Sequence, residues 1–245
     1  MVFTLQNKRI VITGGTSGIG LEMVRQLYGP NELIVIGRNP EKLAQLSGQF
    51  PGIATFIADL SDIVQTVKTA QDIAARYRHL DGLINNAASQ SETHFTDPAF
   101  NPHTINAEIA TNFTSLCLLT HGLLPTLRRA SDARILNINS ALAITPKKSS
   151  AVYCATKGAV NIFTRSLRYQ LEETNVRVQQ AFMPLVDTAM TAGRGAGKVS
   201  AAYAAARALY GLKHGIADHM IGKTKLLKLL HMLVPPLSYR ILKEA

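Results

Sequence analysis

The stretch Thr13-Gly14-Gly15-Thr16-Ser17-Gly18-Ile19-Gly20 decides the fold of this 245-residue chain. The β-branched run Arg9–Thr13 leads into it and predicts a strand, and the amphipathic run Ile19–Tyr28 that follows predicts a helix. Glycines let the backbone turn tightly and approach a pyrophosphate, whose charge the amides and dipole at the helix N-terminus stabilise. The stretch therefore predicts a dinucleotide-binding turn, and the alternative is a glycine-rich turn that serves only tight packing.

The rest of the chain repeats this alternation of short β-branched runs with longer runs of helical apolar spacing. The predicted strands are Arg9–Thr13, Glu32–Ile36, Ile53–Ile57, Gly82–Asn85, Arg134–Ile138 and Arg177–Phe182, and the predicted helices are Ile19–Tyr28, Pro40–Gln49, Ile63–Tyr77, Thr104–Ala130 and Ala151–Thr174. Such alternation is typical of βαβ units and a parallel sheet. The sequence thus predicts an α/β fold of Rossmann type, a doubly wound, mostly parallel sheet that binds ligands beyond the carboxyl ends of its strands.

No linker rich in Pro, Gly or Ser divides the chain, so we expect a single domain over residues 1–245. Within it, the glycine-rich residues 189–200 are predicted to form a mobile loop beside the substrate. Residues 226–245 are apolar and basic and are predicted to form a C-terminal amphipathic helix.

The composition, 47% hydrophobic and 17% charged, is that of a globular protein with a sizeable core. Cys117 and Cys154 lie far apart without CxxC spacing, and the seven histidines show no ligand spacing, so neither a disulfide framework nor a metal site is predicted. The start of the chain, Met1 to Arg9, lacks the apolar region of a signal peptide, and no apolar run is long enough to cross a bilayer. We expect a cytoplasmic protein.

The formal charge of +10 indicates nucleic acid, anionic lipid or a phosphorylated ligand as a partner, or simply a solvated basic surface. Half of the excess lies in residues 207–245, where seven Lys and Arg stand against two acids. Aromatic residues are few and no nucleic-acid motif is present, so nucleic-acid binding is not predicted.

Further short motifs and single polar residues follow the predicted strands or lie within the predicted helices. They are Asp59-Leu60 after the third strand, Asn85-Asn86-Ala87 at the fourth, Asn112 in a long helix, Ser140 after the fifth strand, and Tyr153 and Lys157 in the next helix. With the Thr-Gly-x-x-x-Gly-x-Gly turn, this series resembles the short-chain dehydrogenase/reductase family over roughly Lys8 to Thr188. The resemblance implies an oxidoreductase that moves a hydride between a nicotinamide cofactor and a small carbonyl or alcohol.

Tyr153 and Lys157 are four residues apart and share one face of a predicted helix. A phenol with a pKa of about 10 is a poor base at neutral pH. An ammonium about 5 Å away, at an effective dielectric of about 20, would favour the phenolate by roughly 3 kcal/mol, or about two pKa units. We therefore expect Tyr153 to exchange a proton with the substrate as general acid or base.

The other catalytic assignments rest on position and on the resemblance. Ser140 follows a strand at the ligand-binding edge, where its hydroxyl can hydrogen-bond the substrate oxygen, and the alternative is a cap of a helix or turn. The family resemblance implies that Lys157 also binds the nicotinamide ribose and that Asn112 holds a water linking Lys157 to solvent. The alternative for Asn112 is a surface amide.

The second strand ends in Ile36-Gly37-Arg38-Asn39, without the acid that binds a ribose 2′-hydroxyl. We therefore predict NADP(H), with Arg38 on the 2′-phosphate, against the alternative of a solvated loop cation. The predicted cofactor contacts are Gly14, Thr16, Ser17, Gly18, Ile19, Gly20, Arg38, Asp59, Leu60, Asn86, Ala87, Tyr153, Lys157 and Thr188. Thr188 is the weakest match to the family pattern, because Leu185 replaces a glycine and the threonine comes one residue early.

The tail departs from many relatives, which end in a strand and a Val-Asp-Gly-Gly segment that helps to build a tetramer. Here residues 221–236 predict a basic amphipathic helix stopped by prolines, and this tail resembles that of bacterial DltE-like oxidoreductases. We expect a homodimer through the helices Thr104–Ala130 and Ala151–Thr174. The leucines of the tail are expected to pack on the domain or shelter the active-site mouth, and the alternative is that they enter an anionic membrane surface while Lys225 and Lys228 face outward.

An alternative of another class is an NADP(H)-binding regulatory protein with little or no turnover. The intact Ser140, Tyr153 and Lys157 favour the enzyme, because a protein that only binds could dispense with the phenol. The substrate is expected to meet residues 141–150, the loop of residues 188–200 and the tail, which point to no one chemistry.

Overall fold

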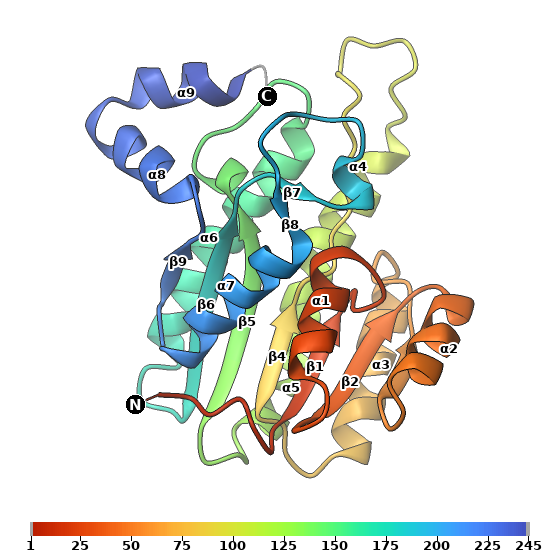
Figure 1. Ribbon diagram of the computed structural model, residues 1–245. Helices are drawn as coiled ribbons and strands as arrows, with labels where there is room; N and C mark the ends of the chain where they lie inside the picture. The colour runs from red at the N-terminus through yellow and green to blue at the C-terminus, as the bar shows by residue number, and fades with distance from the viewer. Residues whose placement is uncertain (1, 244–245) are drawn as a thin grey trace.

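The computed structural model describes residues 2–243, and a seven-stranded parallel sheet forms its centre (Figure 1). In spatial order the strands are β3 (Ala54–Ile57), β2 (Glu32–Gly37), β1 (Arg9–Thr13), β4 (Gly82–Asn85), β5 (Ala133–Ser140), β6 (Val176–Met183) and β9 (Asp218–Met220). β2 and β3 extend the sheet on one side of β1, and β4, β5, β6 and β9 extend it on the other side. This is the order of a doubly wound sheet. The predicted fold class is confirmed.

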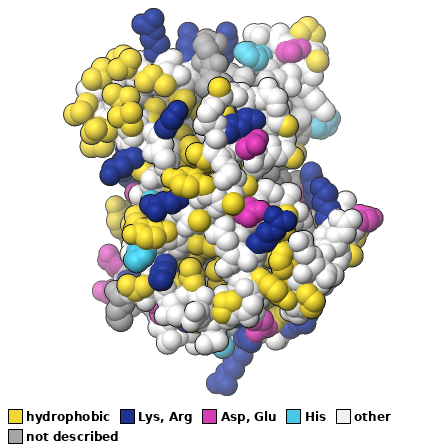
Figure 2. Space-filling view, viewed as in Figure 1, with side chains coloured by type: hydrophobic (Ala, Val, Ile, Leu, Met, Phe, Trp, Pro, Cys, Tyr) yellow, Lys and Arg dark blue, Asp and Glu magenta, His cyan; other side chains and the backbone are white. Residues whose placement is uncertain are grey.

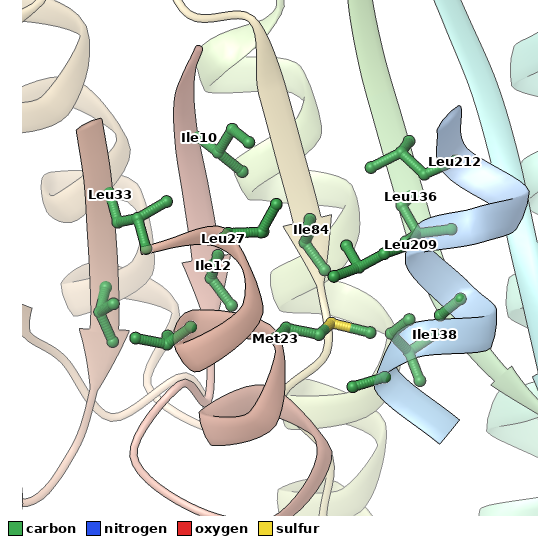
Figure 3. Close-up of a cluster of buried hydrophobic side chains, with 14 of the residues drawn as sticks. Ile10, Ile12, Met23, Leu27, Leu33, Ile84, Leu136, Ile138, Leu209 and Leu212 are labelled. Atoms are coloured by element: carbon green, nitrogen blue, oxygen red, sulfur yellow. The ribbon is translucent and has the colours of Figure 1, made fainter. Parts of the chain in front are cut away.

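One face of the sheet is covered by α1 (Gly18–Leu27), α2 (Pro40–Gln49) and α7 (Ala201–Lys213). In Figure 3, Ile10 and Ile12 of β1 lie in one cluster with Met23 of α1 and Leu209 of α7. Because successive side chains of a strand point to opposite faces, Val11 belongs to the cluster on the other side. The near-continuous apolar runs of the inner strands are explained by this burial on both faces.

The opposite face is covered by α3 (Ile63–Arg76), α5 (Ser115–Leu127) and α6 (Ala151–Gln170). The single helix expected over Thr104–Ala130 is wrong in detail, because the structure divides it into α4 (His103–Ile109), a π-helical turn (Ala110–Thr114) and α5. The wider turn is centred on Asn112, whose side chain is held by neighbouring segments, as described below. Single π-turns inside helices often mark functional positions.

The sequence does not predict the helix α7 or the strand β9. Ala201–Lys213 is rich in alanine, so its apolar spacing gives little contrast between faces. β9 is only three residues long and pairs with β6 through Gln180 and Asp218. The expected six-stranded sheet is therefore corrected to a sheet of seven strands in the described part of the chain. The smaller elements are β7 (Val186–Asp187), β8 (Val199–Ser200) and two 3₁₀ turns (Ala141–Ala143 and Ala189–Thr191).

The tail forms two helices, α8 (Thr224–Leu233) and α9 (Pro235–Lys243), where one helix over residues 226–245 was expected. Pro235 ends α8 as predicted but also opens α9, because a proline is tolerated in the first helical turn. Residues 244–245 lie outside the described part of the chain. Both helices lie beyond the carboxyl ends of the strands (Figure 1). Within residues 2–243 no helix is both long and apolar enough to span a bilayer.

Candidate active site

The glycine-rich turn between β1 and α1 has a backbone that only glycine adopts without strain. Gly14 and Gly18 have φ angles of 66° and 53°, in the left-handed region. A Cβ atom on Gly20 would lie 2.2 Å from the carbonyl oxygen of Gly14. Ser17 caps α1 without a side-chain hydrogen bond. The turn is thus a close-approach cradle whose helix N-terminus faces the ligand edge of the sheet, and it fits a pyrophosphate.

Thr13 and Asn86 hold this turn against the end of β4. The amides of Asn86 and Ala87 both donate to Oγ1 of Thr13 at 2.9 Å. In return, Nδ2 of Asn86 donates to the carbonyl oxygens of Thr13 and Gly14 at 3.0 and 3.2 Å. The hydroxyl of Thr13 was not among the predicted contacts, since its role depends on two strands meeting in the sheet.

A cleft of about 730 Å³ opens beyond the carboxyl ends of β1, β4 and β5. The predicted site residues that line it are Gly14, Thr16, Ser17, Gly18, Ile19, Arg38, Asp59, Leu60, Asn86, Ala87, Ser140, Tyr153, Lys157 and Thr188. The predicted residues Gly20 and Asn112 do not line the cleft. Thr188 adjoins the glycine turn, since a Cβ atom on Gly18 would lie 3.1 Å from its methyl carbon. Apolar residues complete the wall, among them Leu142, Met190 and Leu242.

Tyr153 and Lys157 lie one turn apart on the buried face of α6, as their spacing predicted. Nζ of Lys157 lies 5.6 Å from the centre of the Tyr153 ring and donates to the carbonyl oxygen of Ile138 at 2.9 Å. Ser140 forms a hydrogen bond with the Tyr153 hydroxyl, and its Oγ also accepts from the amide of Leu142 at 3.1 Å. Ser140 therefore caps a 3₁₀ turn and faces the phenol at the same time.

Burial dominates the titration of this pair. It raises the pKa of Tyr153 to about 12, against a smaller lowering by the hydrogen bond from Ser140. It lowers the pKa of Lys157 to about 8. The expected net lowering of the phenol's pKa is therefore wrong for this structure, because burial disfavours the phenolate more than neighbouring groups favour it. At neutral pH Tyr153 carries its proton.

Asn112 is buried in the π-helical turn, so the alternative of a surface amide is wrong. Its Oδ1 accepts from the amide of Ser89 at 2.8 Å, and its Nδ2 donates to the carbonyl oxygen of Ser89 at 2.8 Å and to Oγ1 of Thr156 at 3.2 Å. Thr156 in turn donates to the carbonyl oxygen of Tyr153 at 2.8 Å. Asn112 thus joins the segment after β4 to the turn of α6 that carries the phenol.

Comparison of the sequence with known families gives a match to the short chain dehydrogenases over residues 8–199. The protein belongs to the short chain dehydrogenase family. An uncharacterized oxidoreductase of Bacillus subtilis, DltE, is 35% identical over 187 residues, which cover 76% of this chain and 74% of that protein. An uncharacterized oxidoreductase of Staphylococcus epidermidis is 30% identical over 194 residues, covering 77% and 82% of the two chains. The predicted resemblance, including that to DltE, is confirmed.

Solved structures of the family share the fold. A short chain dehydrogenase from Burkholderia cenocepacia, in complex with NADP, superimposes with a TM-score of 0.87 at 21% identity, covering 98% of this chain and 99% of that one. A 3-ketoacyl-(acyl-carrier-protein) reductase from Brucella melitensis, complexed with NADH, gives 0.80 at 20% identity over 89% and 98% of the two chains. These likenesses establish the architecture, and the family match makes the protein an oxidoreductase.

The end of the cleft beside β2 and β3 carries one cation and one carboxylate in this dehydrogenase. Arg38 is exposed at the end of β2 and lines the cleft, and no ion pair within residues 2–243 involves it. Asp59 points its Oδ1 at Ser61, whose amide and hydroxyl donate to it at 2.9 and 2.8 Å. The local serine thus occupies this oxygen of the carboxylate, whereas the guanidinium is available to an anion.

The mouth of the cleft holds an ionic cluster that the sequence did not predict. Glu92 pairs with Lys147 and, at 2.6 Å, with Arg194. Burial opposes ionisation of Glu92, but the hydrogen bonds from these two cations outweigh it and lower its pKa. The three residues come from loops after β4, β5 and β6, which meet only in the fold. No signal in the sequence joins them.

A buried acid lies close behind the phenol. Glu108, one turn before Asn112, accepts from the amide of Ser91, and burial raises the pKa of its carboxyl. Its position in the sequence did not indicate a role. Among residues 2–243 no group of three His, Cys, Asp or Glu has the arrangement of a metal site, and Cys117 and Cys154 are free thiols.

Proposed function

We propose that this protein is an NADP(H)-dependent oxidoreductase that interconverts small carbonyl compounds and alcohols, with Tyr153 as the proton donor and acceptor. The observation that carries the proposal is the meeting of the Ser140–Tyr153–Lys157 group with the glycine-rich cradle in one cleft. A cradle for a pyrophosphate beside a buried phenol is what hydride transfer with proton exchange requires.

The cradle and the cleft wall would hold the cofactor. The backbone amides at Gly18 and Ile19 suit the pyrophosphate, and Arg38 suits a 2′-phosphate because a guanidinium forms strong charge-assisted hydrogen bonds with phosphate oxygens. The relatives solved with NADP and with NADH support a nicotinamide cofactor, and Arg38 supports the phosphorylated form. The nicotinamide would supply or accept the hydride.

The protein's own residues would move the proton. Tyr153, protonated at neutral pH because its pKa is about 12, donates its proton to the carbonyl oxygen as negative charge develops there. Ser140 shares a hydrogen bond with the phenol and would hold the same oxygen in place. The Lys157 ammonium, one turn away, would stabilise the phenolate that remains after the transfer.

After the transfer, Tyr153 would regain a proton from solvent by way of Lys157. Lys157 donates to the carbonyl oxygen of Ile138, and Asn112 fixes the adjoining segment through Ser89 and Thr156. We assign Asn112 to this path as a positioning residue, through a water that it would hold between Lys157 and solvent. Its buried position and its two bonds to one backbone residue suit a fixed scaffold for such a water.

The decisive experiment follows NADPH oxidation by the whole protein at the nicotinamide absorbance, over a panel of small aldehydes and ketones. Tyr153→Phe should lower the rate by about a hundredfold or more, since proton transfer by a placed side chain contributes that much. Its NADPH affinity, measured by nicotinamide fluorescence, should change little. Tyr169→Phe is the matched control, because Tyr169 lies on the same helix but is 71% exposed.

Equal rates for wild type and Tyr153→Phe would remove the catalytic assignment. Tight NADPH binding by wild type without oxidation by any carbonyl compound of the panel would instead favour the alternative of a regulatory protein.

We also propose that two copies associate through α5 and α6, which is supported by the exposed Ile162 on α6.

A further inference from the structure

The helices α8 and α9 expose large apolar side chains on a surface that nothing within residues 2–243 covers. Figure 2 shows hydrophobic side chains gathered over these helices. Leu226, Met232 and Leu233 are 59%, 68% and 70% exposed. The full set is Leu226, Leu229, Met232, Leu233, Val234, Leu237, Tyr239 and Ile241. The expectation that the tail leucines pack on the domain or shelter the cleft is therefore wrong for Leu226, Leu229 and Leu233. Leu227 is buried, Leu230 is half-buried, and Leu242 lines the cleft. We call this set the tail surface.

The helices that carry the tail surface are fixed to the domain. Oγ1 of Thr224, at the start of α8, donates to the carbonyl oxygens of Ile221 and Phe182 at 2.8 and 3.3 Å. At the end of α9 the amide of Lys148 donates to the carbonyl oxygen of Lys243 at 2.9 Å. Because the pair is held at both ends, the exposed side chains form one defined surface.

Cations border the tail surface, and residues 219–243 contain no acid. Lys223, Lys225, Lys228, Arg240 and Lys243 lie in or beside α8 and α9, and the nearest acids in the sequence are Asp218 and Glu244. None of the ion pairs within residues 2–243 involves these five cations. On α8, Lys225 and Lys228 are three residues apart and form a stripe beside the one that carries Leu226, Leu229 and Leu233. Apolar side chains with a basic border are typical of helices that lie in a membrane interface.

We propose that the tail surface docks on an anionic lipid bilayer, with its leucines among the acyl chains and its lysines at the headgroups. Charge decides between this partner and a second copy of the chain. A twofold interface would bring the same five cations of each copy together, which like-charge repulsion disfavours. An anionic bilayer would attract all of them.

Docking in this way would bring the catalytic cleft to the membrane. Leu242 of α9 lines the cleft, so the helix that contacts lipid on one side forms part of the cleft wall on the other. The inference rests on exposure and charge in the tail and stands apart from the proposed chemistry.

The test is co-sedimentation of the full chain with phosphatidylcholine vesicles that contain or lack phosphatidylglycerol. Wild type should bind the anionic vesicles and bind the neutral ones far more weakly. Lys225→Gln with Lys228→Gln should lower the partition coefficient on anionic vesicles about fivefold per charge. Leu229→Gln with Leu233→Gln should lower it about tenfold or more per leucine, because the buried apolar area is lost without a change in charge.

Two exposed positions elsewhere serve as matched controls, Val64→Gln for the leucines and Arg128→Gln for the lysines. They should bind as wild type does, and thermal melting should show all variants folded. Absence of binding by folded wild type, or binding that the leucine pair does not weaken, would overturn the proposal. So would a wild-type dimer in light scattering that the leucine pair converts to monomer, since a second copy would then cover the tail surface.

Discussion

The buried ammonium of Lys157 makes a prediction with a defined size and sign. Its pKa is about 8 in the folded protein against 10.5 for an ordinary lysine. Between these values the unfolded chain binds a proton that the folded chain does not, so stability rises with pH through this window. At pH 7 the charge costs the folded state about 3 kcal/mol relative to the neutral amine, and by pH 10 this cost falls to about 1 kcal/mol.

Lys157→Met removes the titration while roughly keeping the volume of the side chain. The stability of the variant relative to wild type should therefore be greater at pH 7 than at pH 10, by about 2 kcal/mol. The lost hydrogen bond to Ile138 acts at both pH values and does not alter this difference. Urea unfolding at the two pH values measures it, with Lys148→Met, at an exposed position, as the control. A difference that is independent of pH, or larger at pH 10, would refute the role of burial.

Three further predictions concern the cofactor and the assembly. Gly20→Ala should weaken NADPH binding about tenfold or more and lower the melting temperature, because its Cβ would lie 2.2 Å from the Gly14 oxygen. The control Gly48→Ala has open space around its Cβ and should change neither quantity. Equal effects of the two variants in NADPH titration and thermal melting would contradict the cradle. Arg38→Ala should raise the KM for NADPH about tenfold or more and leave that for NADH unchanged, so steady-state kinetics that show equal effects would remove the NADP(H) assignment. Light scattering should give a dimer that Ile162→Asp, at a 64% exposed position on α6, converts to monomer, and a stable tetramer would be inconsistent with this interface.

Much of the fold could be read from local patterns. The strands Arg9–Thr13 and Gly82–Asn85 have the predicted bounds, because short β-branched runs between turns have few other stable conformations. The seventh strand of the sheet, β9, could not be predicted, since its three residues form a strand only where β6 offers a free edge. Long-range pairing of this kind leaves no periodic signal in so short a segment.

The candidate site divides in the same way. The side chains of Tyr153 and Lys157 share a face because of their spacing alone, and the turn around Gly18 is fixed by glycines next to one another in the chain. Glu92 meets Arg194 and Lys147 only because three loops end at one edge of the sheet. Sequence spacing carries no information about such a meeting.

The sequence by itself determined the doubly wound fold, the dinucleotide turn and the pairing of phenol and ammonium, because each depends on residues within a few positions of one another. Only the tertiary structure decided how that pair titrates. Burial raises the pKa of Tyr153 and lowers that of Lys157, against the trend that an isolated helix would show. The degree of burial depends on atoms from many segments that are distant in the sequence. The exposure of Leu229 and Leu233 was likewise decided by the fold, since an amphipathic pattern predicts an apolar face but not what covers it.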